Sequence, residues 1–125
     1  MRILGLGVDL ADVDRVTAVL ARYPRFADRC FTRHEREYAF RFAHPERRLA
    51  ARFAGKEAVM KAMGTGWRRV RWTDIEITGG GKPTVRLHGT AAERAASMGI
   101  TEVLITITHT DSAALVMAVA VGEHA

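Results

Sequence analysis

Apolar and polar positions change period along this chain, from helical spacing in the first half to strand-like alternation in the second. Residues 2–8 (RILGLGV) are mostly apolar and predict a buried strand that runs into Asp9. Apolar residues at roughly helical spacing then predict a helix over about 12–22. Residues 32–35 (TRHE) have the form of a capping box, so a second helix is expected to start there.

Proline and glycine mark the ends of the later elements. Pro45 suits the first turn of a longer helix that runs to about Met63, and Gly64 suits its end. Farther along, alternating residues around a glycine-rich turn predict a hairpin, which a short helix and two more strands follow. These expected elements are strands over 74–78 and 84–88 around the turn 79–83, a helix over 90–98, and strands over 102–108 and 113–121.

The order of these elements predicts an α+β fold with a mainly antiparallel sheet packed with helices. A length of 125 residues suits a single small domain over residues 1–125, and 48% hydrophobic with 26% charged residues is typical of a folded globular protein. The longest apolar run, residues 113–121, is too short to cross a bilayer, and the first residues do not have the layout of a signal peptide. We therefore expect a cytoplasmic protein with no membrane partner.

The net charge of +5 is distributed unevenly along the chain. Residues 1–62 hold 13 Lys and Arg against 8 Asp and Glu, whereas residues 63–125 hold 6 of each kind. The excess in the first half indicates an acidic partner or a polyphosphate ligand there. No aromatic-interleaved basic motif typical of a nucleic-acid module accompanies it, so we expect no nucleic-acid partner. The single cysteine, Cys30, is expected to pack in the core.

The helix over 45–63 also carries candidate chemistry. Leu49, Phe53 and Met60 would form an apolar ridge that faces the core. Glu57 and Lys61 are four residues apart, beside that ridge, and the small residues of the same side would leave open space around them. One interpretation is an ordinary exposed ion pair worth ~0.3–0.5 kcal/mol.

Neighbouring residues favour a phosphate site over that interpretation. Residues 64–66 (GTG) form a small turn whose backbone can approach a phosphate closely, and Arg48 and Arg52 add guanidinium groups. Asp9 is a second carboxylate at a strand end, and Mg²⁺ is typically held by one or two carboxylates with waters and substrate phosphate. Asp9 and Glu57 could therefore hold Mg²⁺ if the fold brings them together, and a lysine nearby, Lys61, could then neutralise charge on the phosphate.

Six segments together resemble the small, stand-alone type of 4'-phosphopantetheinyl transferase, the holo-acyl-carrier-protein synthases. The resemblance runs nearly end to end, and its most specific parts are GVD and KEAVMKAMGTG. The segments are GVDLADVDR (7–15), RFADRCFTRHE (25–35), RFAGKEAVMKAMGTG (52–66), WTDIEI (72–77), GKPTVRLHG (81–89) and ITITHT (105–110).

The resemblance implies a reaction and a metal site. Enzymes of this family move the 4'-phosphopantetheine arm of coenzyme A to a serine of apo-acyl carrier protein and release adenosine 3',5'-bisphosphate, in support of fatty acid or polyketide synthesis. The resemblance implies that Asp9 and Glu57 are the ligands of Mg²⁺ and that Lys61 is the lysine beside the transferred phosphate. Either a metal-bound water or a neighbouring carboxylate would take the serine proton, and the sequence leaves both open.

The resemblance also implies where the substrates bind. Arg15 and Arg22 share a helix face and would bind the acidic carrier protein, with Arg25 and Arg29 as weaker candidates. Small members of the family are homotrimers with active sites at subunit interfaces, so the same is expected here. Residues implied in coenzyme A binding are Arg48, Arg52, Lys61, Gly64, Thr65, Gly66, Pro83 and His109.

The chain departs from the family pattern at three positions. Thr106 and Thr108 stand where serines are usual before His109, so the hydroxyls are kept. Gly55 stands where alanine is usual, which costs up to ~1 kcal/mol in a helix interior. Two other interpretations stay open: a basic module that binds RNA or another polyanion without catalysis, and a different magnesium-dependent enzyme that transfers phosphate from a nucleotide.

Overall fold

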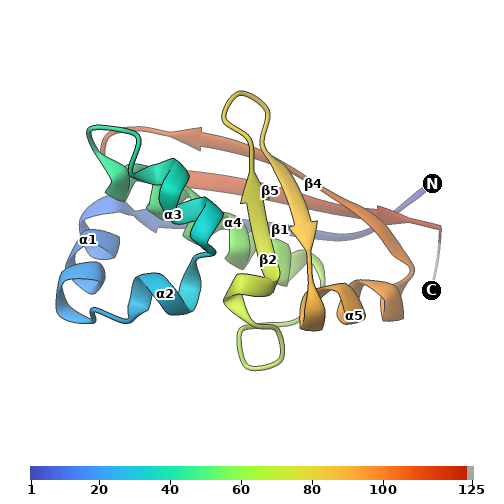
Figure 1. Ribbon diagram of the computed structural model, residues 1–125. Helices are drawn as coiled ribbons and strands as arrows, with labels where there is room; N and C mark the ends of the chain where they lie inside the picture. The colour runs from blue at the N-terminus through green and yellow to red at the C-terminus, as the bar shows by residue number, and fades with distance from the viewer. Residues whose placement is uncertain (124–125) are drawn as a thin grey trace.

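Three long antiparallel strands form the main sheet of the protein. The computed structural model describes residues 1–123. β1 (Arg2–Asp12), β5 (Ala113–Gly122) and β4 (Ile100–His109) pair in the order β1-β5-β4, so the first strand lies beside the last. Figure 1 shows these strands running across the molecule, with the N-terminus and the end of β5 at the same side.

Helix α4 (Pro45–Ala62) packs on the inner face of this sheet at very short range. Glycines in β1 permit the approach, because an ideal Cβ on Gly5 would lie 1.8 Å from the carbonyl oxygen of Ala62. The same atom on Gly7 would lie 1.9 Å from the carbonyl oxygen of Ala58. Ala54 and Ala58 are fully buried in this contact. The space beside the small residues of this helix is therefore filled by backbone and apolar side chains, so the open space expected around Glu57 does not lie over them.

A second layer covers the other side of α4. The hairpin of β2 (Ile75–Thr78) and β3 (Thr84–Leu87) forms a separate two-stranded sheet, and α3 (Arg33–Ala39) packs beside it. Ridge residues Leu49 and Met60 are buried, as expected, but so is most of the rest of α4. The remaining elements are α1 (Val13–Arg22), α2 (Phe26–Cys30), the 3-10 turn η1 (Trp72–Asp74) and α5 (Gly89–Met98).

Most expected elements are confirmed with small changes in their bounds. Thr32 closes a full capping box with Glu35, and Gly64 ends α4 with a positive φ of 61°. The first strand is longer than predicted: it continues to Asp12, so Asp9 lies within the strand and pairs with Val116. The short helix α2 was not predicted. None of the helices within residues 1–123 is long and apolar enough to cross a lipid bilayer.

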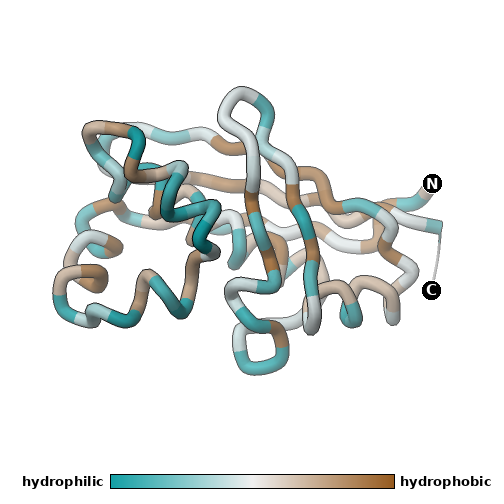
Figure 2. Tube along the Cα trace, in the orientation of Figure 1, coloured by the Kyte–Doolittle hydropathy of each residue, from teal (hydrophilic) through white to brown (hydrophobic). Residues whose placement is uncertain are grey.

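The outer face of the main sheet is apolar and exposed. Register aligns Leu6 with Val119 and Leu104, and aligns Val8 with Met117. Figure 2 shows apolar positions recurring along these strands. We call this surface the outer sheet face; its large exposed apolar residues are Leu6, Val8, Leu10, Leu104, Leu115 and Met117. Exposed apolar residues grouped on one surface are typical of interaction sites.

Candidate active site

Asp9 and Lys61 meet between β1 and α4, with the Asp9 side chain 14% exposed. The side chain of Asp9 faces α4 because residues alternate along the strand, with Gly7 and Ala11 on the same face. Lys61 Nζ lies 3.0 Å from Asp9 Oδ1 and donates a second hydrogen bond to the carbonyl oxygen of Val8, also at 3.0 Å. The helical ion pair that Glu57 and Lys61 would make on an exposed face is replaced by this contact across two elements.

Glu57 lies on α4 one turn before Lys61 and shares the cleft with Asp9. Burial raises the pKa of the Glu57 carboxyl, and the negative charge of Asp9 raises it further. Lys61 and Arg15 oppose this shift of the Glu57 pKa without cancelling it. Two carboxylates are thus held close enough to repel each other, in a place where water screens them incompletely.

The carboxylates open into a cleft of about 490 Å³ between β1, α1 and α4. Arg15 from α1 brings a positive charge to its rim, while Phe26 and Phe53 form part of an apolar wall. Asp12 caps α1 by accepting from the backbone N–H of Asp14 at 2.9 Å, which fixes the start of the helix that carries Arg15. The cleft therefore combines acidic ligands, a basic rim and room for an elongated substrate.

A second pocket, of about 180 Å³, lies at the first turns of α4. We call it the arginine pocket; it is lined by Tyr38, Arg48, Ala51, Arg52, Gly79, Gly80, Gly81, Pro83, Ile107 and His109. Arg52 is 4% exposed, its Nη2 donates to the carbonyl oxygen of Gly79 at 3.1 Å, and its Nε has no hydrogen-bond partner among residues 1–123. Burial lowers the pKa of the Arg52 guanidinium. No carboxylate among residues 1–123 forms an ion pair with Arg52, and a buried cation of this kind is suited to an anionic ligand.

Aromatic rings orient both arginines of this pocket. The Arg52 guanidinium lies 4.6 Å from the centre of the Tyr38 ring, and that of Arg48 lies 4.0 Å from the centre of the Phe42 ring. Sequence reasoning assigned the arginines and His109 to coenzyme A, but it gave no role to the two rings or to the glycines of the expected turn 79–83. Tyr38 lies in α3 and Phe42 in the segment between α3 and α4, so the fold and not a local motif brings both rings to the pocket.

The cleft and the arginine pocket lie on opposite sides of α4. Successive residues of a helix turn by about 100°, so Arg48 and Glu57, nine residues apart, project in opposite directions. On the sheet, Asp9 and Ile107 both pair with Val116, which places them two strands, or about 10 Å, apart with the helix between them. Within a single chain the two sites therefore open in different directions.

The remaining predicted residues are dispersed. Gly64, Thr65 and Gly66 form a shallow hollow with Trp67, Arg68 and Arg69, at the opposite end of α4 from Arg48. Thr106 and Thr108 alternate with Ile107 and His109, so their hydroxyls belong to the outer sheet face. Arg22 is exposed on α1, with Arg25 and Arg29 beside Phe26 in a neighbouring hollow.

Cys30 is buried as expected, and its thiol is unreactive. The thiol is 2% exposed, and burial raises its pKa to about 11. A thiol with that pKa is protonated at neutral pH and is a poor nucleophile. Cys30 therefore packs in the small core with Phe31, Ala39 and Leu49.

The donor set of the cleft fits magnesium. Within residues 1–123, no group of three or more His, Cys, Asp or Glu side chains is placed to hold a metal ion. Asp9 and Glu57 supply two hard oxygen ligands, and Mg²⁺ commonly keeps several waters and adds substrate phosphate. Their mutual repulsion is the kind that a divalent cation relieves.

Comparisons with known proteins match this chain almost from end to end. Residues 5–119 match the sequence model of the 4'-phosphopantetheinyl transferase superfamily. A holo-[acyl-carrier-protein] synthase of Solibacter usitatus is 51% identical over 120 residues, which cover 93% of this chain and 94% of that protein.

Solved structures agree in fold. An acyl carrier protein synthase of Plasmodium yoelii with ADP bound has a TM-score of 0.88 at 29% identity, covering 98% of each chain. A holo-(acyl-carrier-protein) synthase of Bacillus anthracis in complex with CoA (3',5'-ADP) has a TM-score of 0.78 at 28% identity, covering 97% of this chain and 98% of that one.

Proposed function

Because this chain belongs to the 4'-phosphopantetheinyl transferase superfamily, we propose that it transfers the 4'-phosphopantetheine arm of coenzyme A to a serine of apo-acyl carrier protein. The products are holo-acyl carrier protein and adenosine 3',5'-bisphosphate. The observation that carries this function is the carboxylate pair of Asp9 and Glu57 in a cleft, within a chain that matches holo-acyl-carrier-protein synthases over nearly its whole length. The family match favours this reaction over a polyanion-binding module or a nucleotide-dependent enzyme.

Asp9 and Glu57 would hold a magnesium ion in the cleft. When bound, magnesium supplies positive charge that offsets the negative charge of the coenzyme A pyrophosphate during transfer. Lys61 is anchored by the Val8 carbonyl oxygen and by Asp9, which places its ammonium beside the carboxylates. From that position Lys61 would bind an oxygen of the transferred phosphate and orient it toward the serine hydroxyl.

The arginine pocket would bind the phosphorylated nucleotide end of coenzyme A. Arg52 presents a buried guanidinium, and Arg48 and His109 line the same pocket beside the glycine turn 79–81. Bidentate donors of this kind suit phosphate oxygens, and the turn leaves room for a large group. Pro83 gives the turn a fixed exit into β3.

We expect the protein to act as a homotrimer in which neighbouring chains complete each other's sites. The outer sheet face gives the chain an apolar surface to bury against another copy. Since the cleft and the arginine pocket lie on opposite sides of α4, coenzyme A can span both kinds of site where they come from two chains. Small-residue contacts from Gly64, Thr65 and Gly66 would then complete the coenzyme site.

The transfer reaction is tested by mass spectrometry of the carrier protein. After incubation of apo-acyl carrier protein with this protein, coenzyme A and Mg²⁺, the carrier is expected to gain the mass of one phosphopantetheine arm. Replacement of the carrier's modified serine by alanine serves as the control and should prevent the gain. Absence of the gain on every acyl carrier protein tested would contradict the function.

The exposed face of α1 is expected to dock the acidic carrier. Arg22 is the better residue for testing carrier docking, because Arg15 also lies at the rim of the cleft beside Glu57 and its replacement could affect both substrates. Arg22→Glu is expected to raise the KM for the carrier about tenfold, equivalent to ~1.4 kcal/mol, and to leave the KM for coenzyme A nearly unchanged. Arg86→Glu reverses an exposed charge on β3 as a matched control. Equal effects of Arg22→Glu on both substrates would show that α1 is not the dock.

A further inference from the structure

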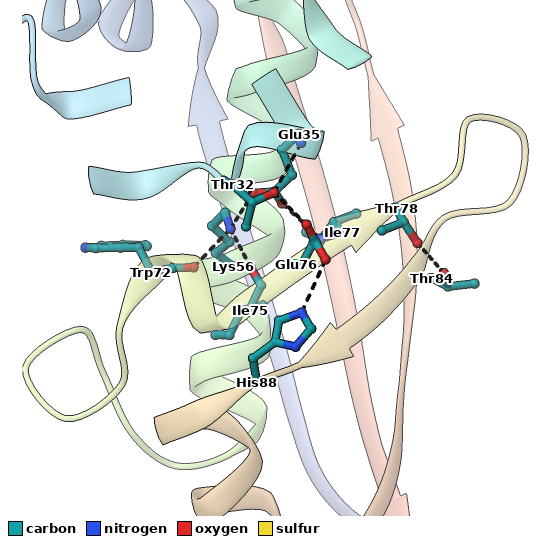
Figure 3. A network of polar contacts seen from close by, with 10 residues as sticks. All are labelled: Thr32, Glu35, Lys56, Trp72, Ile75, Glu76, Ile77, Thr78, Thr84 and His88. Atoms are coloured by element: carbon teal, nitrogen blue, oxygen red, sulfur yellow. Dashed lines mark hydrogen bonds and ion pairs between the residues drawn. The ribbon is translucent and has the colours of Figure 1, made fainter. Parts of the chain in front are cut away.

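A fully buried ion pair lies between α4 and the β2–β3 hairpin. Lys56 and Glu35 are both 0% exposed, and Lys56 Nζ lies 2.7 Å from Glu35 Oε1. The ammonium also donates to the carbonyl oxygen of Trp72 at 3.0 Å and to that of Ile75. Figure 3 shows the three acceptors around Lys56. Each of the three ammonium hydrogens thus has a partner.

Glu35 is equally satisfied and ties α3 to the same hairpin. Its Oε2 accepts from the backbone N–H of Ile77 at 2.9 Å, and its Oε1 accepts from the backbone N–H of Thr32, also at 2.9 Å. Lys56 and Glu35 therefore hold β2 from two sides, at the carbonyl oxygen of Ile75 and at the N–H of Ile77. The pair fixes the position of β2 along α4.

Stability alone does not account for such a pair. Burial of two charges costs several kcal/mol per ion, and apolar residues of similar volume often stabilise a core as well or better. Burial lowers the pKa of Lys56, and the Glu35 carboxylate opposes that shift. What an apolar pair cannot do is bind particular backbone groups of β2 and so fix the register between strand and helix.

The strand held in this way leads directly into the arginine pocket. Gly79 follows Ile77 by two residues, and its carbonyl oxygen accepts from Arg52, which lies one helical turn before Lys56 on the same face of α4. Gly55 brings helix and strand close, because an ideal Cβ there would lie 2.3 Å from Ile77 Cδ1. The register of β2 on α4 therefore sets where the turn 79–81 lies relative to Arg52.

We propose that the Lys56–Glu35 pair is a positioning device for coenzyme A binding, holding the turn 79–81 in place against Arg52 through β2. This inference rests on the proposed function, which assigns the arginine pocket to coenzyme A. The carboxylate cleft lies on the other side of α4, and no residue of β2 lines it. Loss of the pair should therefore weaken coenzyme A binding and leave carrier recognition intact.

Two variants test the proposal. Glu35→Leu combined with Lys56→Met replaces the pair by apolar residues of similar volume, which keeps the core filled and leaves no unpaired buried charge. Glu35→Gln is the milder change, which keeps the side-chain shape and weakens the contact with Lys56. For both we expect the dissociation constant for coenzyme A, measured by calorimetry, to rise roughly 10- to 100-fold with an unchanged KM for the carrier.

Glu76→Gln is the matched control. Glu76 stands between Ile75 and Ile77 on β2, but it faces away from α4 and contacts Thr32 at 2.7 Å and His88 at 3.2 Å. Its replacement should leave coenzyme A affinity unchanged. Unchanged affinity in a folded Glu35 variant, or parallel losses for coenzyme A and carrier, would overturn the proposal. Because calorimetry needs no carrier, failure of the proposed transfer in the unmodified protein would be seen separately, as coenzyme A binding without modification of the carrier.

Discussion

Replacement of Glu57 by glutamine is expected to lower the rate of phosphopantetheine transfer by about 10²–10³-fold, the loss typical when one group that stabilises a charged transition state is removed. Glutamine keeps the shape of the side chain and removes the negative charge that, with Asp9, would hold Mg²⁺. The measurement is the rate of holo-acyl carrier protein formation, followed by mass spectrometry over a range of Mg²⁺ concentrations. A fall of less than tenfold would contradict the assignment of Glu57 as a ligand.

Thermal unfolding separates this loss of function from a loss of fold. A carboxyl pKa that is raised in the folded state means that the folded protein binds the proton more tightly than the unfolded chain. The Glu57 charge therefore lowers the free energy of unfolding at a pH above both pKa values. Glu57→Gln removes that cost, so its Tm without metal should equal or exceed that of the unmodified protein. Added Mg²⁺ should raise the Tm of the unmodified protein and leave that of the variant unchanged.

Local signals in the sequence were sufficient for most of the fold. The capping box at Thr32, the proline at the start of α4 and the glycine after α4 are read from neighbouring residues, and the structure confirms each of them. Helix α2 was missed because five residues are too few for a helical period to show. The length of β1 was underestimated, because Asp9 and Asp12 interrupt the apolar run although the backbone stays extended.

The candidate site was predictable in its residues but not in its arrangement. Asp9 and Glu57 were found through carboxylate chemistry and family resemblance, and the fold brings them into one cleft. The pairing of Lys61 with Asp9 was not predictable, because it joins residues 52 positions apart and depends on the close approach of α4 to the glycines of β1. The opposite orientation of Arg48 and Glu57 follows from their nine-residue spacing on the predicted helix. What the sequence could not show is that both faces of this helix are buried, one against the main sheet and the other against the β2–β3 hairpin.

Because the cleft and the arginine pocket lie on opposite sides of α4, we expect transfer activity to return when two inactive variants assemble together. Glu57→Gln removes a cleft ligand and leaves the arginine pocket intact. A second variant, with Arg48→Glu and His109→Ala, damages the arginine pocket and leaves the cleft intact. Each variant alone is expected to be nearly inactive. If each site joins the cleft of one chain to the arginine pocket of the next, a mixed trimer contains sites in which both halves are unaltered.

The size of the recovery follows from random assembly. Trimers formed at random from equal amounts of the two variants pair an intact cleft with an intact pocket in about one site in four. Every mixed trimer has one such site among its three, so mixed trimers should regain about a third of the unmodified activity. Two affinity tags select mixed assemblies after co-expression, and light scattering gives their mass. As the matched control, each variant is co-expressed with itself, one copy carrying each tag, and the assemblies that hold both tags should stay inactive. Mixed trimers without recovered activity would show that cleft and pocket do not form one site across chains, and a monomeric mass would contradict the expected trimer.

Met117→Glu on the outer sheet face should abolish the recovery by preventing assembly, because it buries a charge at the surface that the chains would share.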